Sequence, residues 1–319
     1  MKLKKEYIIL ALVMAVLVLY LAMHKSNRIH YKLPAVTPVT EKQISKIEIA
    51  RNGKSVFLHK KDNNWYIGEK EYPADQDKVT GMLRVLKDFT ITALVSQSEN
   101  YIRYDLTSDK KITVKAWQGK KMVRYFQVGK AAPTFHHTFV LLPDNVNVYH
   151  ARGDFRRVFD RSLDDLRDMV VLAFENNEIR KIDITVKKTS LLLTQTKIPV
   201  VKKDKKSAKT SNKPEMKTVW KNIKGKNVDR ARVDRLLQFL NHLECEKYIY
   251  GKKKDEFKNP QYRIVLDGTK KYSLAIFSKT KKEDKSYPGI SSKNRDPFML
   301  SDSQVSSLKT KIDDIVKKK

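Results

Sequence analysis

Hydrophobic and polar residues alternate in two segments that lie far apart in the chain. Residues 44–49 read ISKIEI and are followed by SVFL at 55–58. The same pattern returns 135 residues later, as IRKIDI at 179–184 and SLLL at 190–193. Alternation with a period of two is typical of a half-buried strand. The chain is therefore predicted to form the same strand pair twice.

Each copy continues into a predicted amphipathic helix. Asp75 and Asp229 precede the two helices, and a carboxylate at that place accepts hydrogen bonds from the free amides of the first turn. Apolar residues then recur at i, i+3, i+4, i+7 and i+10, which predicts one buried helical stripe in each copy. These positions are Val79, Met82, Leu83, Leu86 and Phe89 in the first copy, and Val233, Leu236, Leu237, Leu240 and Leu243 in the second.

Further segments match in the same order. A Trp follows the strand pair in each copy, at Trp65 and Trp220, and both are predicted to anchor a core rather than to bind a ligand. Later hairpins, strands and a last helix are predicted at 112–128 and 264–277, at 139–141 and 298–300, and at 303–316. Six matched segments in one order indicate an internal duplication, with a first α+β repeat at 43–175 and a second at 176–319.

The second copy is longer than the first because of a lysine-rich tract. Residues 202–217 read KKDKKSAKTSNKPEMK, with seven Lys against one Asp and one Glu. A segment of this composition cannot bury a core. It is therefore predicted to be a disordered insertion in a hairpin of the second repeat.

The N-terminal segment has a different composition. Seventeen residues from Tyr7 to Met23 carry no charge, and as a helix they would extend about 25 Å. Residues 1–24 are therefore predicted to be a transmembrane signal anchor, followed by a stalk at 25–42. A buried core helix and a cleaved signal peptide remain alternatives. Lysines before the helix favour a cytoplasmic N-terminus, which predicts a single-pass protein of the bacterial cytoplasmic membrane with its body facing the periplasm or the outside.

Together these elements predict an α+β fold. It consists of an N-terminal transmembrane helix followed by two duplicated β-rich domains, each with antiparallel strands and an amphipathic helix.

The chain is strongly basic, with 66 Lys and Arg against 36 Asp and Glu and a formal net charge of +30. Such a surface attracts polyanions, including acidic polysaccharide, anionic lipid and nucleic acid. Lys outnumbers Arg and no cluster suited to reading bases occurs, so specific nucleic-acid recognition is not expected. The residues predicted to bind acidic polymers are Lys202, Lys203, Lys205, Lys206, Lys209, Lys252, Lys253 and Lys254. Beside the last three, Tyr248 and Tyr250 share one face at strand spacing, either as a stacking surface or as a buried aromatic face.

No motif nominates a catalytic, metal or cofactor site. The sequence contains no His-Glu-x-x-His, no Gly-rich phosphate loop and no Gly-x-Ser-x-Gly. Cys245 is the single Cys, which excludes an intramolecular disulfide, and it is predicted to be a small packed residue. His136 and His137 are neighbours that point to opposite faces of a strand. The protein is therefore predicted to be non-catalytic and to hold no metal and no cofactor.

Several short motifs together suggest a protein family. The chain combines the apolar N-terminal segment and the Ile-x-x-Ile-x-Ile strand with Pro73-Ala74-Asp75, Tyr104-Asp105-Leu106 and Asp165-Leu166-Arg167-Asp168. In these features it resembles the bacterial family numbered 4340 among the domains of unknown function, over most of residues 40–260. The resemblance implies an extracytoplasmic accessory role beside ABC-type export systems, including those linked to gliding motility, and no catalytic residues.

Three functions remain open on the sequence. The first is an envelope-facing scaffold or accessory subunit that binds protein partners in a membrane complex, such as an ABC-type export or gliding-motility system. The second is a binding module for acidic polymers, which uses the basic surface. The third is an enzyme with an unrecognised site, for which a deep pocket between the repeats would be the signature.

Overall fold

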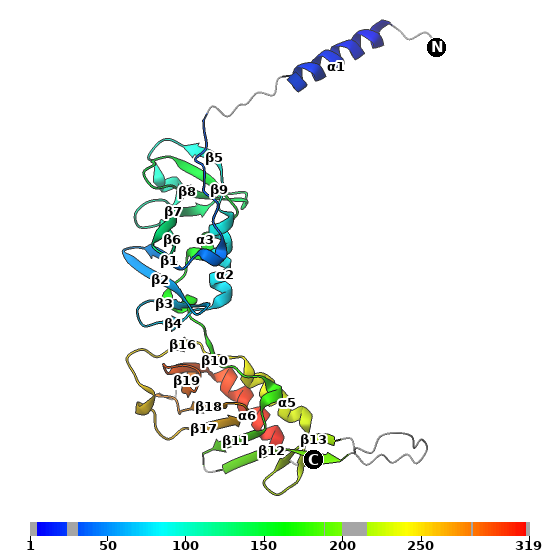
Figure 1. Ribbon diagram of the computed structural model, residues 1–319, viewed down its shortest axis with the longest axis vertical. Coiled ribbons are helices and arrows are strands. Elements are labelled where there is room, and N and C mark those ends of the chain that lie inside the picture. Colours follow the sequence, from blue (N-terminus) through cyan, green and yellow to red (C-terminus); the bar gives the residue numbers. More distant parts are fainter. Residues whose placement is uncertain (1–4, 24–30, 188, 200–215, 282, 317–319) are drawn as a thin grey trace. The chain divides into compact units, whose positions relative to one another are not determined.

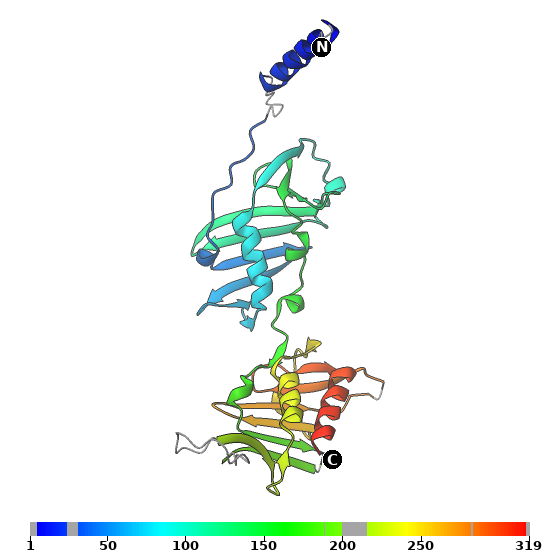
Figure 2. The same ribbon diagram turned by 90° about the vertical axis from the view of Figure 1, so that its right-hand side faces the viewer.

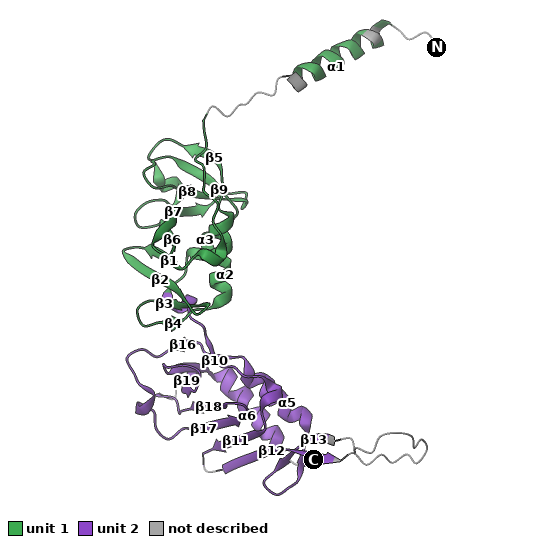
Figure 3. Cartoon of the chain, viewed as in Figure 1, with its two compact units in different colours: residues 1–162 green, residues 163–319 purple. Residues whose placement is uncertain are grey.

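The computed structural model of the protein describes residues 5–23, 31–187, 189–199, 216–281 and 283–316 (Figure 1). The chain divides into two compact units, residues 1–162 and 163–319, which Figure 3 shows in different colours. The sequence places the boundary between its repeats at residues 175 and 176, a short distance C-terminal to this division. The predicted insertion lies outside the described residues up to residue 215.

Unit 1 is built on one antiparallel sheet of nine strands. The strands are β1 Lys46–Arg51, β2 Lys54–Lys61, β3 Asn64–Ile67, β4 Tyr72–Pro73, β5 Ile91–Ser96, β6 Ile112–Gln118, β7 Lys121–Ala131, β8 His137–Leu141 and β9 Val148–Arg152. From edge to edge the order is β4-β3-β2-β1-β6-β7-β8-β9-β5. Most neighbours in the sequence pair as hairpins, and β5 returns to the far edge beside β9.

Unit 2 contains a second nine-stranded antiparallel sheet and a separate two-stranded one. The strands are β10 Val170–Leu172, β11 Lys181–Val186, β12 Thr189–Pro199, β13 Met216–Asn222, β14 Asn227–Val228, β15 Leu243–Glu244, β16 Lys247–Tyr248, β17 Tyr262–Asp267, β18 Lys271–Ile276, β19 Ser286–Ser291 and β20 Phe298–Ser301. The large sheet has the order β14-β13-β12-β11-β17-β18-β19-β20-β16, and β10 pairs with β15.

The two large sheets correspond strand for strand. Reading each order from its first edge, β4 matches β14, β1 matches β11, β6 matches β17, and β5 matches β16 at the far edge. The registers agree as well. Glu48 pairs with Phe57 in unit 1, and Asp183 pairs with Leu192 in unit 2, each 135 residues further along. The corresponding positions of the two units can therefore be compared residue by residue.

Longer helices cover one face of each sheet. They are α2 Gln76–Asp88 in unit 1, and α5 Arg230–Asn241 and α6 Asp302–Val316 in unit 2. Figure 2 shows α2 crossing the first sheet, and α5 and α6 side by side across the second. Short helical turns occur at α3 Arg156–Phe159, α4 Leu163–Leu166, η1 Glu41–Gln43, η2 Tyr101–Tyr104, η3 Asn176–Glu178 and η4 Lys254–Glu256.

The predicted N-caps are confirmed. Asp75 accepts hydrogen bonds from the amides of Asp77 and Lys78 at 3.0 and 3.1 Å. Asp229 accepts one from the amide of Ala231 at 2.9 Å. These bonds satisfy first-turn donors that have no partner inside the helix.

The cores lie between the helices and the sheets. Ile47 and Ile49 of β1 are buried, as are Val79, Met82 and Leu86 of α2. In unit 2 the four stripe positions within α5 are buried, and Leu243 is buried in β15 beyond the helix. Leu83 is only half-buried, and Phe89 is buried just after α2 ends. Trp65 and Trp220 are buried in equivalent strands, which confirms the prediction that they anchor cores.

The predicted fold class is wrong. The structure is mostly β-sheet, with two nine-stranded antiparallel sheets and few helices, rather than an α+β fold. The prediction gave too much weight to the helices because an amphipathic stripe is easy to read from the sequence. Strands of two residues, such as β4, β14 and β16, are too short to show an alternation.

The prediction of an N-terminal transmembrane helix at residues 1–24 is corrected too. A helix, α1, runs from Lys5 to Met23. Among the residues that the structure describes, no helix has both the length and the apolar character needed to cross a membrane. The prediction rested on the seventeen uncharged residues from Tyr7 to Met23, a stretch at the short end of the range that spans a hydrocarbon core.

Candidate functional site

Lys252, Lys253 and Lys254, three of the eight lysines predicted to bind acidic polymers, lie together in unit 2. They follow β16 and lead into η4. With Asp255, Arg295 and Asp296 they line a surface hollow of about 500 Å³, which we call the basic hollow. Four of these six residues are cationic, so the hollow has an excess of positive charge. The other five predicted lysines lie outside the described residues: Lys202, Lys203, Lys205, Lys206 and Lys209.

The three lysines differ in their surroundings. The Lys254 ammonium is half-buried and donates to the carbonyl oxygen of Ser291 at 2.5 Å, and burial lowers its pKa. The Lys252 ammonium lies over the Phe257 ring, 5.9 Å from its centroid, on the exposed side of the loop. The Lys253 side chain is exposed as well. Lys252 and Lys253 are therefore the lysines of the hollow that present charge to solvent.

A buried arginine lies beside the hollow. Only 3% of the Arg167 side chain is exposed, and its Nη2 donates to Oδ2 of Asp296 at 2.9 Å. Its guanidinium lies over the Tyr248 ring, 3.5 Å from the centroid, and its Nη1 donates to the Tyr250 hydroxyl at 3.2 Å. We call these four residues, Arg167, Tyr248, Tyr250 and Asp296, the Arg167 cluster. Of these four residues, Asp296 also lines the basic hollow, so it joins the cluster to the wall of the hollow.

The hydroxyl groups of the cluster are held in place. Tyr248 donates to the carbonyl oxygen of Asp168 at 2.6 Å, and Tyr250 donates to the Asp164 carboxylate. Burial raises the pKa of Tyr248, and burial followed by the bond to Asp164 raises the pKa of Tyr250 to about 12. Burial likewise raises the pKa of the neighbouring Cys245 thiol to about 12. The two Tyr hydroxyls and the Cys245 thiol therefore stay protonated near neutral pH, and the cluster keeps one pattern of hydrogen bonds and charges.

Further bonds fix the loop that carries Asp296. Lys293 donates from its ammonium to Oδ2 of Asp168 at 2.6 Å and to the carbonyl oxygen of Val170 at 2.8 Å. The buried side chain of Asn294 also donates to that carbonyl, at 3.2 Å. The wall of the hollow is therefore tied to the start of unit 2 by several side chains, and the hollow is a preformed feature of the surface.

The sequence indicated the tyrosine pair and the lysines of this site, but not the pair of Arg167 and Asp296. It placed Tyr248 and Tyr250 on one face, and the structure turns both rings toward Arg167, with Tyr248 buried and Tyr250 exposed. It also nominated the lysines of the hollow. It did not assign Arg167 a role, although the Asp165-Leu166-Arg167-Asp168 motif contains it. Asp296 lies 129 residues from Arg167, and no local pattern joins the two.

Other sequence candidates lie elsewhere. His137 is in β8, half-buried and stacked on His150 at 5.1 Å between ring centroids, whereas His136 precedes the strand and is exposed. Burial, and then the charge of His137, lower the pKa of His150. Within the described ranges, no group of three or more His, Cys, Asp or Glu side chains is placed to hold a metal ion. Cys245 is buried in the core of unit 2, which confirms its prediction as a packed residue.

Comparison with known proteins identifies a family for this chain. No curated protein and no solved structure matches the chain. The family described as Domain of unknown function (DUF4340) matches residues 65–262, which is more than half of the chain and includes the Arg167 cluster apart from Asp296. The chain therefore belongs to the DUF4340 family.

Proposed function

We propose that the protein is a non-catalytic scaffold that binds partner proteins as an accessory subunit of a membrane complex. One observation carries the proposal. The chain contains two units with the same nine-strand order, and in each unit the longer helices cover one face of the sheet (Figure 2). The opposite face is then available for a partner, so one chain offers two surfaces of similar architecture.

The family resemblance supports ABC-type export or gliding-motility systems as the class of partner. The charge supports a partner with acidic surfaces, because the protein carries a formal net charge of +30 and opposite charge accelerates association. An envelope-facing location stays a prediction, which digestion of the protein by external protease in intact cells would test.

Affinity purification tests the scaffold. The tagged full-length chain is expressed in its native cells, extracted in mild detergent and purified, with the tag on an unrelated protein as the control. We expect one or a few membrane proteins to copurify in constant ratio. Recovery of the chain alone, after crosslinking in native membranes as well, would contradict the proposal.

A second function, the binding of acidic polymers, is favoured by the basic hollow. Lys252, Lys253 and Arg295 are exposed around it, and their charges are not cancelled by Asp255 and Asp296. The bonds of Arg167, Lys293 and Asn294 hold the loop that forms one wall, so the exposed cations project from a fixed backbone. Their attraction for an anionic group weakens as salt rises.

Charge-reversal variants test this second function. Lys252→Glu with Lys253→Glu is compared with Lys270→Glu and Lys271→Glu, two exposed lysines at the β17–β18 turn. The probe is polygalacturonate, measured over a range of NaCl concentrations. The first variant is expected to bind more weakly, with a shallower salt dependence, than the second. Equal losses in the two variants would show attraction to net charge alone and would contradict a site at the hollow.

A further inference from the structure

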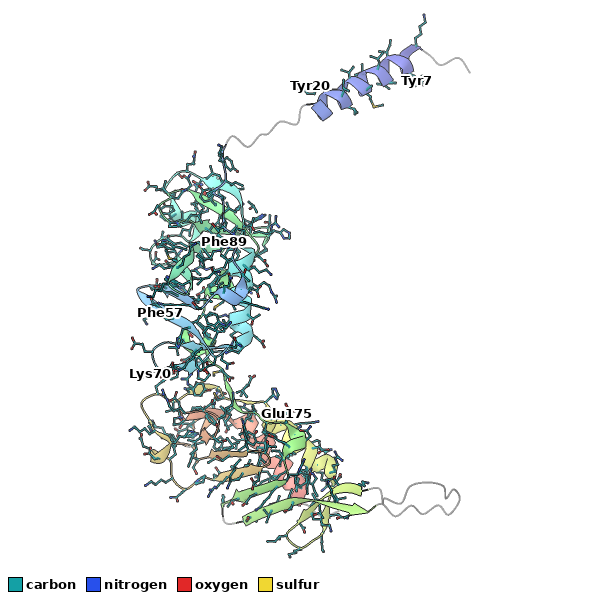
Figure 4. All side chains as sticks on the ribbon, in the orientation of Figure 1. Tyr7, Tyr20, Phe57, Lys70, Phe89 and Glu175 are labelled. Atoms are coloured by element: carbon teal, nitrogen blue, oxygen red, sulfur yellow. The ribbon has the colours of Figure 1, made fainter. Side chains whose placement is uncertain are left out.

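The sheet of unit 1 has a face that α2 does not cover. Ile47 and Ile49 of β1 and Leu58 of β2 are buried on the helix side. Because successive side chains of a strand point to opposite faces, Phe57 and its alternate neighbours lie on the other side. Figure 4 marks Phe57 on the side of the sheet away from α2, and Phe89 on the side of the helix.

Rings gather on this outer face. Phe57, which is 39% exposed, is joined by four half-buried side chains, and we call the five residues the aromatic face. They are Phe57 and His59 of β2, Tyr66 of β3, Trp117 of β6 and Tyr125 of β7. The strand register places them in two adjacent rows. One row contains Tyr66, His59, Lys46 and Trp117, and the other contains Phe57, Glu48, Lys115 and Tyr125.

Two lysines are inserted among the rings. The Lys46 ammonium lies 5.0 Å from the centroid of Phe57 and 4.8 Å from that of Trp117. The Lys115 ammonium lies 5.5 Å from the centroid of Tyr125 and 3.8 Å from the Glu48 carboxylate. Cations over ring faces are held by the negative charge of the π-system. The outer face is therefore a surface of rings on which two ammonium groups have defined positions.

Unit 2 shows that the fold does not require these rings. Leu192 stands at the position of Phe57, because it pairs with Asp183 as Phe57 pairs with Glu48. By the same comparison of registers, the other four ring positions are occupied by aliphatic hydroxyl or charged residues. The full set of unit 2 equivalents is Leu192, Thr194, Lys221, Asp267 and Ser273 for Phe57, His59, Tyr66, Trp117 and Tyr125.

Unit 2 forms the same sheet without rings at these positions, so the fold does not need the rings of unit 1. Partly exposed rings of this kind indicate an interface. Tyr, Trp, Phe and Met are enriched at the centres of protein interfaces, and contiguous apolar patches mark interaction sites. Met122, which is 47% exposed and pairs with Trp117, extends the patch. Nucleic-acid bases and sugars that stack on a protein need open ring faces. Here ammonium groups lie over three of the rings, which favours a protein partner.

We propose that the aromatic face of unit 1 binds an acidic surface of a partner protein. This inference rests on the proposed scaffold function and names the surface that carries it. The rings supply apolar contact, and Lys46 and Lys115 supply positive charge. Glu48 lies 3.8 Å from the Lys115 ammonium, and Glu71 lies 3.8 Å from Nε2 of His59 and is paired with Lys61 at 3.0 Å. Carboxylates of the partner would then meet ammonium groups whose side chains are already ordered.

Photocrosslinking in the native cells tests the proposal on the full chain. A benzophenone amino acid replaces Phe57 in one variant and its unit 2 equivalent, Leu192, in another. We expect a protein adduct from position 57 and none from position 192, with the crosslinked residue lying in an Asp- and Glu-rich segment of the partner. An adduct with nucleic acid, an adduct with a segment free of acidic residues, or equal labelling at the two positions would overturn it.

Substitution by the unit 2 residues provides a second measurement. Phe57→Leu combined with Tyr125→Ser places on unit 1 the side chains that the same fold carries in unit 2, and Leu192→Ala is the matched control. With the crosslinked partner as probe, the double variant is expected to bind about tenfold or more weakly. Thermal unfolding shows whether both variants stay folded. Unchanged affinity in a folded double variant would overturn the proposal.

These outcomes are distinguishable from failure of the scaffold. If partners copurify with the chain but position 57 gives no adduct, the scaffold stands and the aromatic face is not its docking surface. If position 57 gives an adduct but no complex survives purification, the surface stands and a stable accessory subunit does not.

Discussion

The ion pair of the Arg167 cluster provides the sharpest test of how unit 2 is held together. Arg167→Met removes the charge and keeps much of the length of the side chain, and Asp296→Asn removes the opposite charge and keeps the shape. The two variants and their combination form a double-mutant cycle. The cycle isolates the coupling of the two side chains from the loss that each variant causes alone.

The magnitudes follow from burial and geometry. Breaking a buried pair by removal of one partner costs about 3–5 kcal/mol. The Arg167 side chain is 3% exposed and that of Asp296 is 20% exposed, so the carboxylate that remains in Arg167→Met is partly hydrated. We therefore expect that variant to lose about 3 kcal/mol of unfolding free energy. Asp296→Asn is expected to lose about 3 kcal/mol as well, because it leaves the guanidinium, which is 3% exposed, without its carboxylate, although the amide oxygen still accepts from Nη2.

Amide hydrogen exchange is the suitable assay, because it reports each unit separately. The slowest amides of β11 and β17 report unit 2, and those of β1 and β6 in unit 1 are the internal control. The double variant is expected to lose less than the sum of the single losses, with a coupling of about 1–2 kcal/mol. A coupling below about 0.5 kcal/mol, or equal losses in unit 1, would refute the reasoning.

Three further predictions concern local features. Asp75→Ala is expected to cost about 1–2 kcal/mol of unfolding free energy and Asp229→Ala about half as much, because the Asp75 carboxylate accepts from two amides and that of Asp229 from one. Amide exchange in α2 and α5 measures both losses, and equal losses would contradict this. Cys245 is expected to react with a thiol reagent at about pH 8 only after denaturation, because burial raises the pKa of its thiol to about 12. Gly129→Ala is expected to destabilise unit 1, since the new Cβ would clash with a backbone carbonyl oxygen of η2. Gly81→Ala meets open space within α2 and is expected to raise the unfolding free energy by about 0.5–1 kcal/mol. Thermal melts of the two variants measure the difference.

Local signals in the sequence were sufficient for much of the secondary structure. The last helix was predicted at 303–316 and runs over Asp302–Val316, with Val305, Leu308, Ile312 and Ile315 buried. Asp75 and Asp229 were identifiable as caps because a cap acts on the amides that follow it directly. Strands β1 and β11 were identifiable because one buried face imposes strict alternation.

Long-range pairings were not predictable in the same way. Strands β5 and β16 return to the far edge of their sheets, and β16 has only two residues. The partners of Arg167 lie 83 and 129 residues away, so the cluster becomes visible only when the fold brings them together. The aromatic face was also not predictable from local pattern. Phe57 lies in the predicted alternation at 55–58 and His59 follows it, but the side that faces the helix is decided by burial of Leu58, which the pattern alone does not assign.

The two units together separate what the fold requires from what it permits. Positions that are buried in both, such as Ile47 and Ile182, or Trp65 and Trp220, keep their apolar character because the same core must be filled twice. Positions on the outer faces differ sharply, with rings in unit 1 and aliphatic, hydroxyl or charged side chains at the equivalent positions of unit 2. The basic hollow and the Arg167 cluster belong to unit 2. Since the fold is common to both units and these surfaces are not, the surfaces proposed for binding differ between the units, as expected if each unit binds its own partner rather than two copies of one.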